Sequence, residues 1–349
     1  MKSFNYIILI LVIFFKTGNV LSKDNVFNVN NIQIIKTSSI SNEQLANQAI
    51  KKGYKELVEK ILLDKDKKKL ADLNLSQIKN LVSYYQIVNK KEGEVENQST
   101  VSFNIFFDKQ KLHKLFFKNE ILYSEINNKE IYLLPIFQKN NQIFVYNQNF
   151  FYDKWNEIYD NKLIEIIIPI EDIEVVQNIN SNKNNILDID LNILFQEYSK
   201  KNLALVLIEK TSNEKIKIFL KTNILGKKIN KALVLENSNL DSKEYYSKII
   251  QVVSKEIIDL IKSQNLIDIR TPSFLNTKFR INKKNNLVDL EKRLKKIDQI
   301  DEIFIQEFNS EFVLLKIKYL GKLNRIIKQL EEQNIILKLT GDQWRLKII

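Results

Sequence analysis

After its first residues, the chain has apolar runs only of strand length, and this limits what it can fold into. The runs at 164–170 and 204–208 are flanked by charged residues, and each is far shorter than the roughly 20 apolar residues of a transmembrane helix. From Glu130 onward, such runs alternate with amphipathic segments, which is typical of an α/β layer. Uninterrupted apolar stretches such as 166–168 indicate a sheet that is covered on both faces.

A chain of 349 residues is longer than a usual single domain, so we expect several compact units of α+β and α/β type. The pattern predicts a mixed α/β unit over 23–125, a central α/β sheet unit over 130–267 and a third unit over 278–349. Residues 268–277 are the predicted linker before the third unit, because Pro272 interrupts regular structure there.

Two helix starts are well marked in the first unit. Ser41 and Gln44 have the spacing of a capping box, in which each side chain accepts a hydrogen bond from the other residue's backbone N–H. Asp108 is placed to begin a second helix after a strand over 100–107. The first unit is therefore expected to combine helices with β-strands.

The third unit has the order of a split βαβ arrangement. Strands are expected at 278–281, 302–308, 311–319 and 335–339, with helices at 287–297 and 323–333 and a further strand at 344–348. The order βαββαβ predicts a ferredoxin-like fold.

The N-terminus has the features of a secretion signal. Met1 and Lys2 give a positive start, residues 6–15 form an unbroken apolar core, and Ser22 is a small residue suited to cleavage before Lys23. We expect a signal peptide over 1–22 and a periplasmic product. The alternative is an uncleaved N-terminal membrane anchor.

Composition excludes several chemistries. The sequence contains no cysteine, which removes disulfides, thiolate nucleophiles and cysteine-ligated metals. His113 is the only histidine; it lies between lysines without a nucleophile motif and is interpreted as a helix-surface residue. Glycine-rich phosphate-binding loops are absent from the sequence, so no cofactor or metal is expected.

The formal net charge of +12 has two interpretations. The positive charge could bind an anionic partner, or it could reflect abundant lysine on an ordinary solvated surface. The low glycine content and the high Lys, Asn and Ile content favour the second interpretation. Lysine runs such as 51–52, 65–69 and 283–284 are scattered rather than joined in one basic stripe, so no nucleic acid partner is expected.

Three residues are weak candidates for ligand binding. Glu171 and Asp172 follow an apolar strand, where α/β sheets often place binding groups, although a polar turn is the favoured interpretation. Trp155 could belong to an aromatic contact surface, but its helical spacing favours core packing. Asp188 and Asp190 are interpreted as helix-start residues rather than cation ligands.

Several segments resemble one known family. An alanine-containing helix at 46–61, the Tyr-containing strand at 81–85 and the strand ending in Phe-Asp at 101–108 resemble the domain-of-unknown-function 2066 family of proteobacterial exported proteins. The likeness continues through 133–135, Trp155, 168–172 and 196–198. It implies an exported envelope protein and no particular activity.

These observations favour a non-enzymatic periplasmic protein that acts through contacts with other envelope proteins. One alternative is a binding module for an anionic envelope component, either a membrane surface or a wall polymer. A second alternative is a carboxylate-based hydrolase that uses Glu171 and Asp172.

Overall fold

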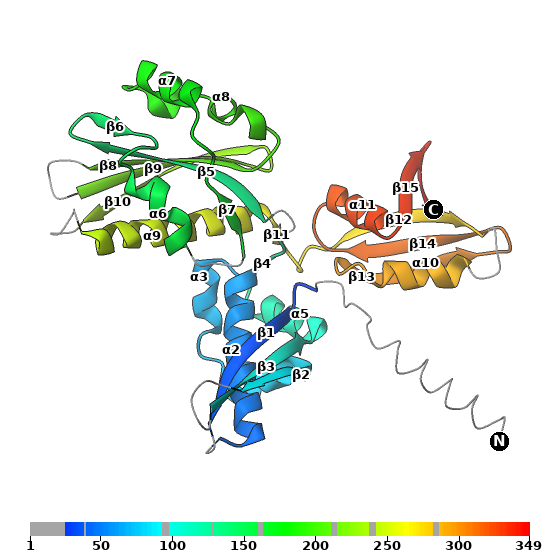
Figure 1. The fold of residues 1–349 in the computed structure, drawn as a ribbon. Helices are drawn as coiled ribbons and strands as arrows, with labels where there is room; N and C mark the ends of the chain where they lie inside the picture. The colour runs from blue at the N-terminus through cyan, green and yellow to red at the C-terminus, as the bar shows by residue number, and fades with distance from the viewer. Residues whose placement is uncertain are drawn as a thin grey trace, which may run out of the picture. The chain divides into compact units, whose positions relative to one another are not determined.

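The computed structural model describes residues 25–37, 40–92, 98–126, 129–159, 163–210, 215–236, 242–281 and 286–349. The predicted signal segment, with Ser22 and Lys23, lies outside these residues. The chain divides into two compact units (Figure 1). The first comprises the chain up to Glu59 together with Asp66–Tyr123 and Ile267–Ile349, and the second comprises Lys60–Lys65 and Ser124–Leu266. The predicted first and third segments therefore contribute to one unit.

The N-terminal part of the first unit contains a three-stranded antiparallel sheet in the order β1-β3-β2. Helix α2 packs on this sheet so closely that a Cβ added at Gly53 would lie 3.0 Å from Ile105. The elements are β1 (Asn28–Thr37), α2 (Asn42–Ile61), α3 (Asp64–Lys67), α4 (Leu75–Leu81), β2 (Val82–Glu92), β3 (Gln98–Phe107) and α5 (Lys109–Lys118).

Side-chain caps fix where these helices begin. The predicted capping box is confirmed: the Ser41 N–H donates to Gln44 Oε1 at 2.9 Å, and the Gln44 N–H donates to Ser41 Oγ at 3.2 Å. Asp108 accepts from the Lys111 N–H at 3.0 Å and caps α5, as predicted. Each cap satisfies an N–H group that has no partner within its helix.

The interpretation of His113 as a surface residue is wrong. Its ring lies on α5 but packs against Phe27 and Tyr123, with ring centroids 5.6 Å apart in both cases. Its Nε2 is buried and has no hydrogen-bond partner among the described residues. Burial lowers the pKa of His113 to about 4, Lys109 lowers it further, and Asp301 acts in the opposite direction. The ring is therefore a neutral part of the packing.

The C-terminal part of the first unit is a five-stranded sheet in the order β13-β14-β12-β16-β15. Strands β12 and β16 are parallel, and the other neighbours are antiparallel. The elements are β12 (Ser273–Arg280), α10 (Asn286–Leu294), β13 (Ile300–Phe308), β14 (Phe312–Tyr319), α11 (Leu323–Glu332), β15 (Ile335–Thr340) and β16 (Gln343–Ile348). The mixed α and β architecture agrees with the sequence, while the ferredoxin-like assignment stays a prediction.

The predicted linker is too long. Strand β12 already begins at Ser273, within the segment 268–277 that proline was expected to keep irregular. Pro272 immediately precedes this strand, a position where a missing N–H removes no ladder hydrogen bond. A two-residue strand, β11 (Leu266–Ile267), pairs with β4 (Tyr123–Ser124) just before the segment.

The second unit is built on a six-stranded mixed sheet in which β5 and β8 are central. Strand β5 runs parallel to β8 and to β7, and β8, β9 and β10 form an antiparallel series. The elements are β5 (Glu130–Lys139), β6 (Gln142–Phe144), α6 (Phe150–Ile158), β7 (Glu165–Ile167), α7 (Ile173–Ser181), α8 (Leu191–Leu194), β8 (Leu203–Lys210), β9 (Lys215–Ile224), β10 (Lys227–Glu236) and α9 (Lys243–Gln264).

Both faces of this sheet are covered, as the apolar strands predicted. Helices α6 and α9 lie on one face, and α7 and α8 lie on the other (Figure 1). Alternate residues of β8 enter separate cores: Val206 packs on the α9 side, and Leu205 and Leu207 pack on the α7 side. Within the described parts of the chain, no helix has the length and hydropathy needed to cross a bilayer.

Asn149 joins strand and helix inside the second unit. Its fully buried amide donates to the carbonyl oxygens of Pro135 at 2.8 Å, Phe144 at 3.0 Å and Val145 at 2.8 Å. Its Oδ1 accepts from the Phe151 N–H at 3.1 Å and thereby caps α6. A single buried side chain therefore satisfies polar groups of β5, the segment after it and α6.

Replacing Asn149 with alanine should lower the free energy of unfolding of this unit by about 3 kcal/mol, because a cap and several buried carbonyl partners are lost together. The measurement is urea unfolding followed by Trp155 fluorescence in a Trp344→Phe background, where Trp155 is the remaining tryptophan. Asn180→Ala, an exposed change in α7, should shift stability by less than about 0.5 kcal/mol. Equal effects of the two changes would contradict the role given to Asn149.

His113 should make the first unit sensitive to acid. Its folded pKa of about 4 lies below the ordinary histidine pKa of 6.5, so its contribution to stability is complete above pH 6.5 and is lost as pH falls toward 4. Between pH 7 and pH 5 we expect a loss of about 1–2 kcal/mol that His113→Leu does not show. The test is to measure the urea midpoints of the wild-type protein and the His113→Leu variant at pH 7 and pH 5. The same loss of stability in both proteins would refute the role given to His113.

Candidate functional site

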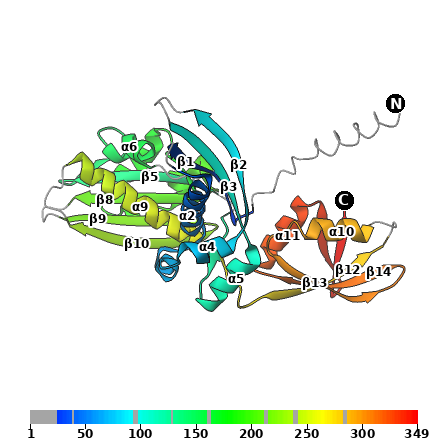
Figure 2. The same ribbon diagram turned by 90° about the horizontal axis from the view of Figure 1, so that it is seen from below.

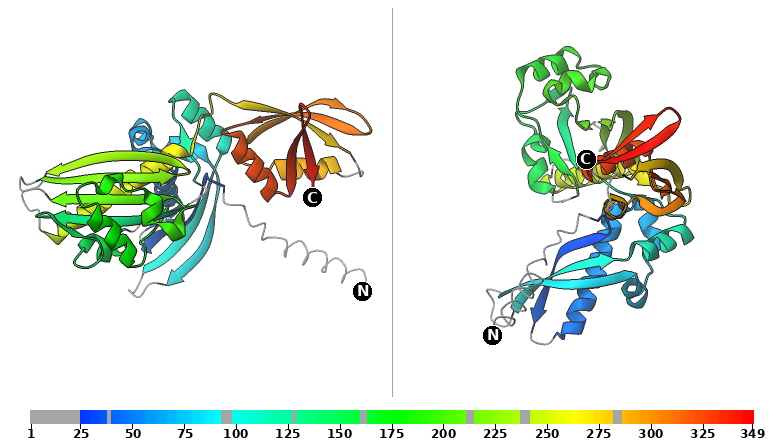
Figure 3. Two further views of the ribbon diagram at one scale, coloured as in Figure 1. Left: turned by 90° about the horizontal axis from the view of Figure 1, so that it is seen from above. Right: turned by 90° about the vertical axis from the view of Figure 1, so that its right-hand side faces the viewer.

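The side of the C-terminal sheet that faces away from α10 and α11 carries a concentration of basic and aromatic side chains. We call this side the outer sheet face. Figure 2 and the left panel of Figure 3 show both helices on one side of the sheet and no described helix on the other. The outer sheet face is therefore the one large sheet surface of this part that described elements leave uncovered.

Strand alternation determines which residues lie on the outer sheet face. In β14, Val313, Leu315 and Ile317 point into the core beneath the helices, so the residues between them point outward. Strand β12 alternates in the same way, with Leu275 and Phe279 buried. Residues directly opposite across a ladder share a face, which extends the assignment to β13, β15 and β16.

Basic residues from four strands gather on the outer sheet face. Lys278 of β12 lies opposite Arg345 of β16, and Arg345 lies opposite Lys338 of β15. These three cations therefore form a row across neighbouring strands. The complete basic set is Lys278, Arg280, Lys316, Lys318, Lys338, Arg345 and Lys347.

Most of these cations have no acidic partner among the described residues. Lys318 pairs with Asp301 at 2.8 Å and with Glu302 at 3.7 Å, near the β13 edge. None of the salt bridges among the described residues involves the other members of the basic set. Like charges held on adjacent strands without counter-charges are mutually destabilising, so an anionic ligand would relieve this repulsion.

Phenylalanine rings lie between the cations. Phe274 is 50% exposed and Phe304 is 44% exposed. The Lys278 ammonium lies 3.6 Å from the centre of the Phe312 ring, and the Lys316 ammonium lies 4.5 Å from the centre of the Phe274 ring. These cation–π contacts keep charge and apolar surface side by side on the outer sheet face.

The predicted carboxylate pair lies elsewhere, on the surface of the second unit. Asp172 caps α7 by accepting from the Glu174 N–H at 2.8 Å, and Glu171 is exposed. The Tyr152 hydroxyl donates to the Pro169 carbonyl at 3.0 Å, which fixes the preceding turn. Burial raises the pKa of Tyr146 to about 12, and the charges of Asp172 and Glu171 contribute to this rise. This geometry is that of a polar turn and a helix cap.

Trp155 is fully buried in the core on the α9 side of the central sheet. Its side chain cannot contribute to a surface for a protein or carbohydrate ligand in this conformation. The structure therefore does not bring Trp155 together with Glu171 and Asp172, and the core-packing interpretation describes Trp155 correctly.

Asp190 is a helix cap, as the sequence indicated. It accepts from the Asn192 N–H at 2.8 Å and pairs with Lys228 at 3.1 Å. The bond from Asn192, followed by that from Lys228, lowers the pKa of Asp190. A pocket beside this segment includes Lys221, but its ammonium donates to the carbonyls of Leu187 at 2.7 Å and Ile189 at 2.9 Å. Lys221 therefore already has partners.

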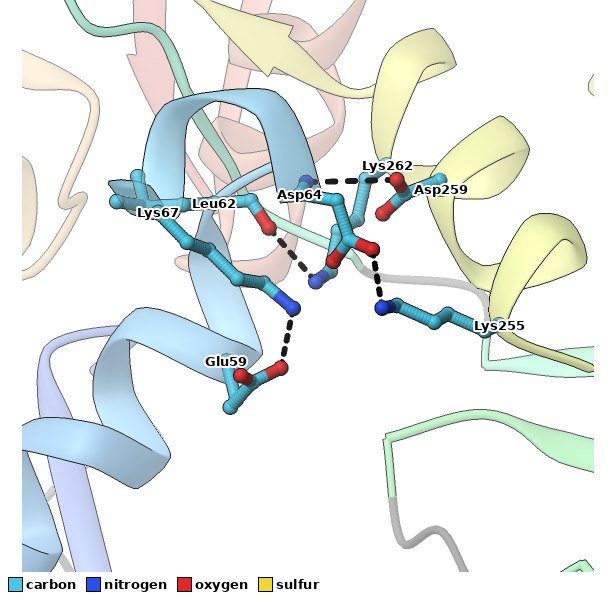
Figure 4. Close-up of polar contacts among 7 residues, drawn as sticks. All are labelled: Glu59, Leu62, Asp64, Lys67, Lys255, Asp259 and Lys262. Carbon is cyan, nitrogen blue, oxygen red and sulfur yellow. Dashed lines mark hydrogen bonds and ion pairs between the residues drawn. The ribbon is translucent and has the colours of Figure 1, made fainter. Parts of the chain in front are cut away.

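A buried lysine in the second unit was not expected from the sequence. Lys262 of α9 is 1% exposed, and its ammonium donates to the Leu62 carbonyl at 2.8 Å (Figure 4). Asp64 pairs with Lys255 at 2.6 Å, and the Asp64 N–H donates to Asp259 at 3.4 Å. These contacts attach the segment 60–65 to α9, so the cluster has a structural role.

The outer sheet face is what the sequence reasoning missed. Its lysines and arginines are separated along the chain and form no continuous basic run, so they look like part of a general lysine excess. The available signal was the alternation of basic with apolar residues in 274–280, 312–319 and 343–348. No group of histidine, aspartate and glutamate in the described part of the chain is arranged to hold a metal ion.

Comparison with known proteins adds little. No protein family and no curated protein matches this sequence, so the resemblance to the domain-of-unknown-function 2066 family stays a prediction. A solved structure titled "Crystal structure of uncharacterized protein" aligns with 40% of this chain and 94% of its own, at 10% identity and a TM-score of 0.18. A likeness this weak carries no argument about fold or function.

Proposed function

We propose that this protein is an exported, non-enzymatic accessory protein of the bacterial cell envelope whose C-terminal part binds an anionic membrane surface. The observation that carries the proposal is the outer sheet face, where cations that form no salt bridge among the described residues lie on the same face as phenylalanine rings, two of them exposed. The signal-like N-terminus and the resemblance to an exported family support the location. A ferredoxin-like arrangement of the C-terminal part belongs to the same proposal.

A membrane surface suits this face better than a wall polymer does. Both partners offer negative charge to Lys338 and Arg345, but only a bilayer also offers an apolar layer to Phe274 and Phe304. Basic residues contribute about 1 kcal/mol each at an anionic bilayer surface, and lysine side chains can reach the headgroups while apolar rings enter the interface. The mixture of cations and phenylalanines therefore favours lipid.

The charge reversal Lys338→Glu with Arg345→Glu should weaken binding to vesicles of phosphatidylglycerol and phosphatidylcholine by at least about tenfold. Co-sedimentation measures this. The matched control is Lys292→Glu with Lys328→Glu, which makes the same charge change at exposed positions of α10 and α11. Equal loss in both double variants would mean that net charge, not the outer sheet face, determines binding.

A second variant distinguishes binding to a lipid bilayer from binding to a wall polymer. Phe274→Ser with Phe304→Ser keeps every charge, so it should weaken vesicle binding while leaving binding to a soluble polyphosphate unchanged. Undiminished vesicle binding by this variant, together with tight salt-sensitive binding of polyphosphate, would favour the wall-polymer alternative.

Export has its own test. Fractionation of producing cells followed by intact-mass analysis should find a periplasmic species that begins at Lys23. A full-length species in the membrane fraction would instead make residues 1–22 an anchor. Crosslinking in the same fraction would identify protein partners, which the preferred interpretation of the sequence expects.

A further inference from the structure

Strand β2 leaves one edge of the N-terminal sheet open. It is the last strand in the order β1-β3-β2, and no other described strand pairs with it. The stretch from Val82 to Asn89 carries no charge and no proline. Tyr84, Tyr85, Ile87 and Val88 are 51%, 45%, 61% and 50% exposed. An uncharged, apolar edge of this kind is a template for pairing with another strand.

The opposite edge of the same sheet is protected. Strand β1 has a bulge between Val29 and Ile32, with Asn31 at a φ of 61°. The Lys52 ammonium donates to the Gln33 carbonyl at 3.1 Å and occupies a backbone group on that strand. Bulges and lysines are the usual devices that prevent edge pairing. Strand β2 also has bulges, but they leave Tyr84 to Ile87 as a regular stretch without any charge.

We infer that β2 pairs antiparallel with β2 of a second copy of this chain, about a two-fold axis through Gln86. This register places Tyr85 opposite Ile87 of the second copy, within the regular stretch of β2. By symmetry the pair occurs twice, and aromatic–β-branched pairs of this kind stabilise antiparallel ladders. A two-fold axis requires such self-complementarity.

The self-complementary sequence is what selects a second copy over an unrelated strand. The backbone N–H and C=O groups of an open edge form a regular ladder only with another extended segment, and β2 itself supplies one with matching side chains. A single strand pair buries less surface than a standard interface, so the dimer should be weak and concentration-dependent. This inference concerns β2 alone and does not depend on membrane binding.

Sedimentation velocity of the purified protein over about 1–100 μM, the range of a weak interface, tests the inference. The wild-type protein should dimerise, and Ile87→Lys should weaken dimerisation at least tenfold. The matched control is Ile35→Lys in β1, because Ile35 is 60% exposed and Ile87 is 61% exposed. A monomeric wild-type protein, or equal effects of the two changes, would overturn the inference.

The absence of cysteine from the sequence allows an independent test of the register. Gln86→Cys would place one thiol beside its symmetry mate, where opposite Cα atoms lie about 4.5–5.5 Å apart, within the range of a disulfide. Mild oxidation should give a covalent dimer. Ile35→Cys should give far less under the same conditions. Equal crosslinking of both variants would show random collision and refute the pairing.

Discussion

The parallel pairing of β5 with β8 is the contact on which the second unit depends. Parallel neighbours cannot be joined by a tight turn, so the chain between Lys139 and Leu203 has to cross back over the sheet. That crossover supplies α6, α7 and α8 and covers both faces. Because the two central strands are buried on both sides, their residues must be apolar almost without interruption, which is the pattern that the sequence displays.

Local rules predicted much of this fold. Caps such as Ser41 with Gln44, and Asp108, depend on residues three positions apart, so a short stretch of sequence contains all the information. The position of His113 depends instead on Phe27, which is far away in the chain, and on Tyr123, which lies beyond the end of α5. The lysines on either side of His113 indicate that part of α5 is exposed. They do not indicate that His113 itself packs against aromatic rings.

The outer sheet face illustrates a different limit. Lys278, Arg345 and Lys338 become neighbours only because β16 lies between β12 and β15. Element order alone does not fix that insertion, and a four-stranded arrangement would distribute the charges differently. The predicted site at Glu171 and Asp172 rested on a general rule about strand ends, whereas the structure uses Asp172 to begin α7. The basic face could not be predicted because the order of strands in the sheet was unknown. At Asp172, helix capping determined the role of the side chain rather than the general rule about strand ends.

The division into units has a consequence for how the chain is assembled during synthesis. All strands of the central sheet belong to one continuous stretch within Ser124–Leu266, so this sheet can form as soon as that stretch has left the ribosome. The other unit includes both the earliest described residues and Ile267–Ile349, so it becomes complete only after those later residues have also been synthesised. Until then, the open edge at β2 belongs to an unfinished unit, which is the condition in which exposed strands aggregate most readily.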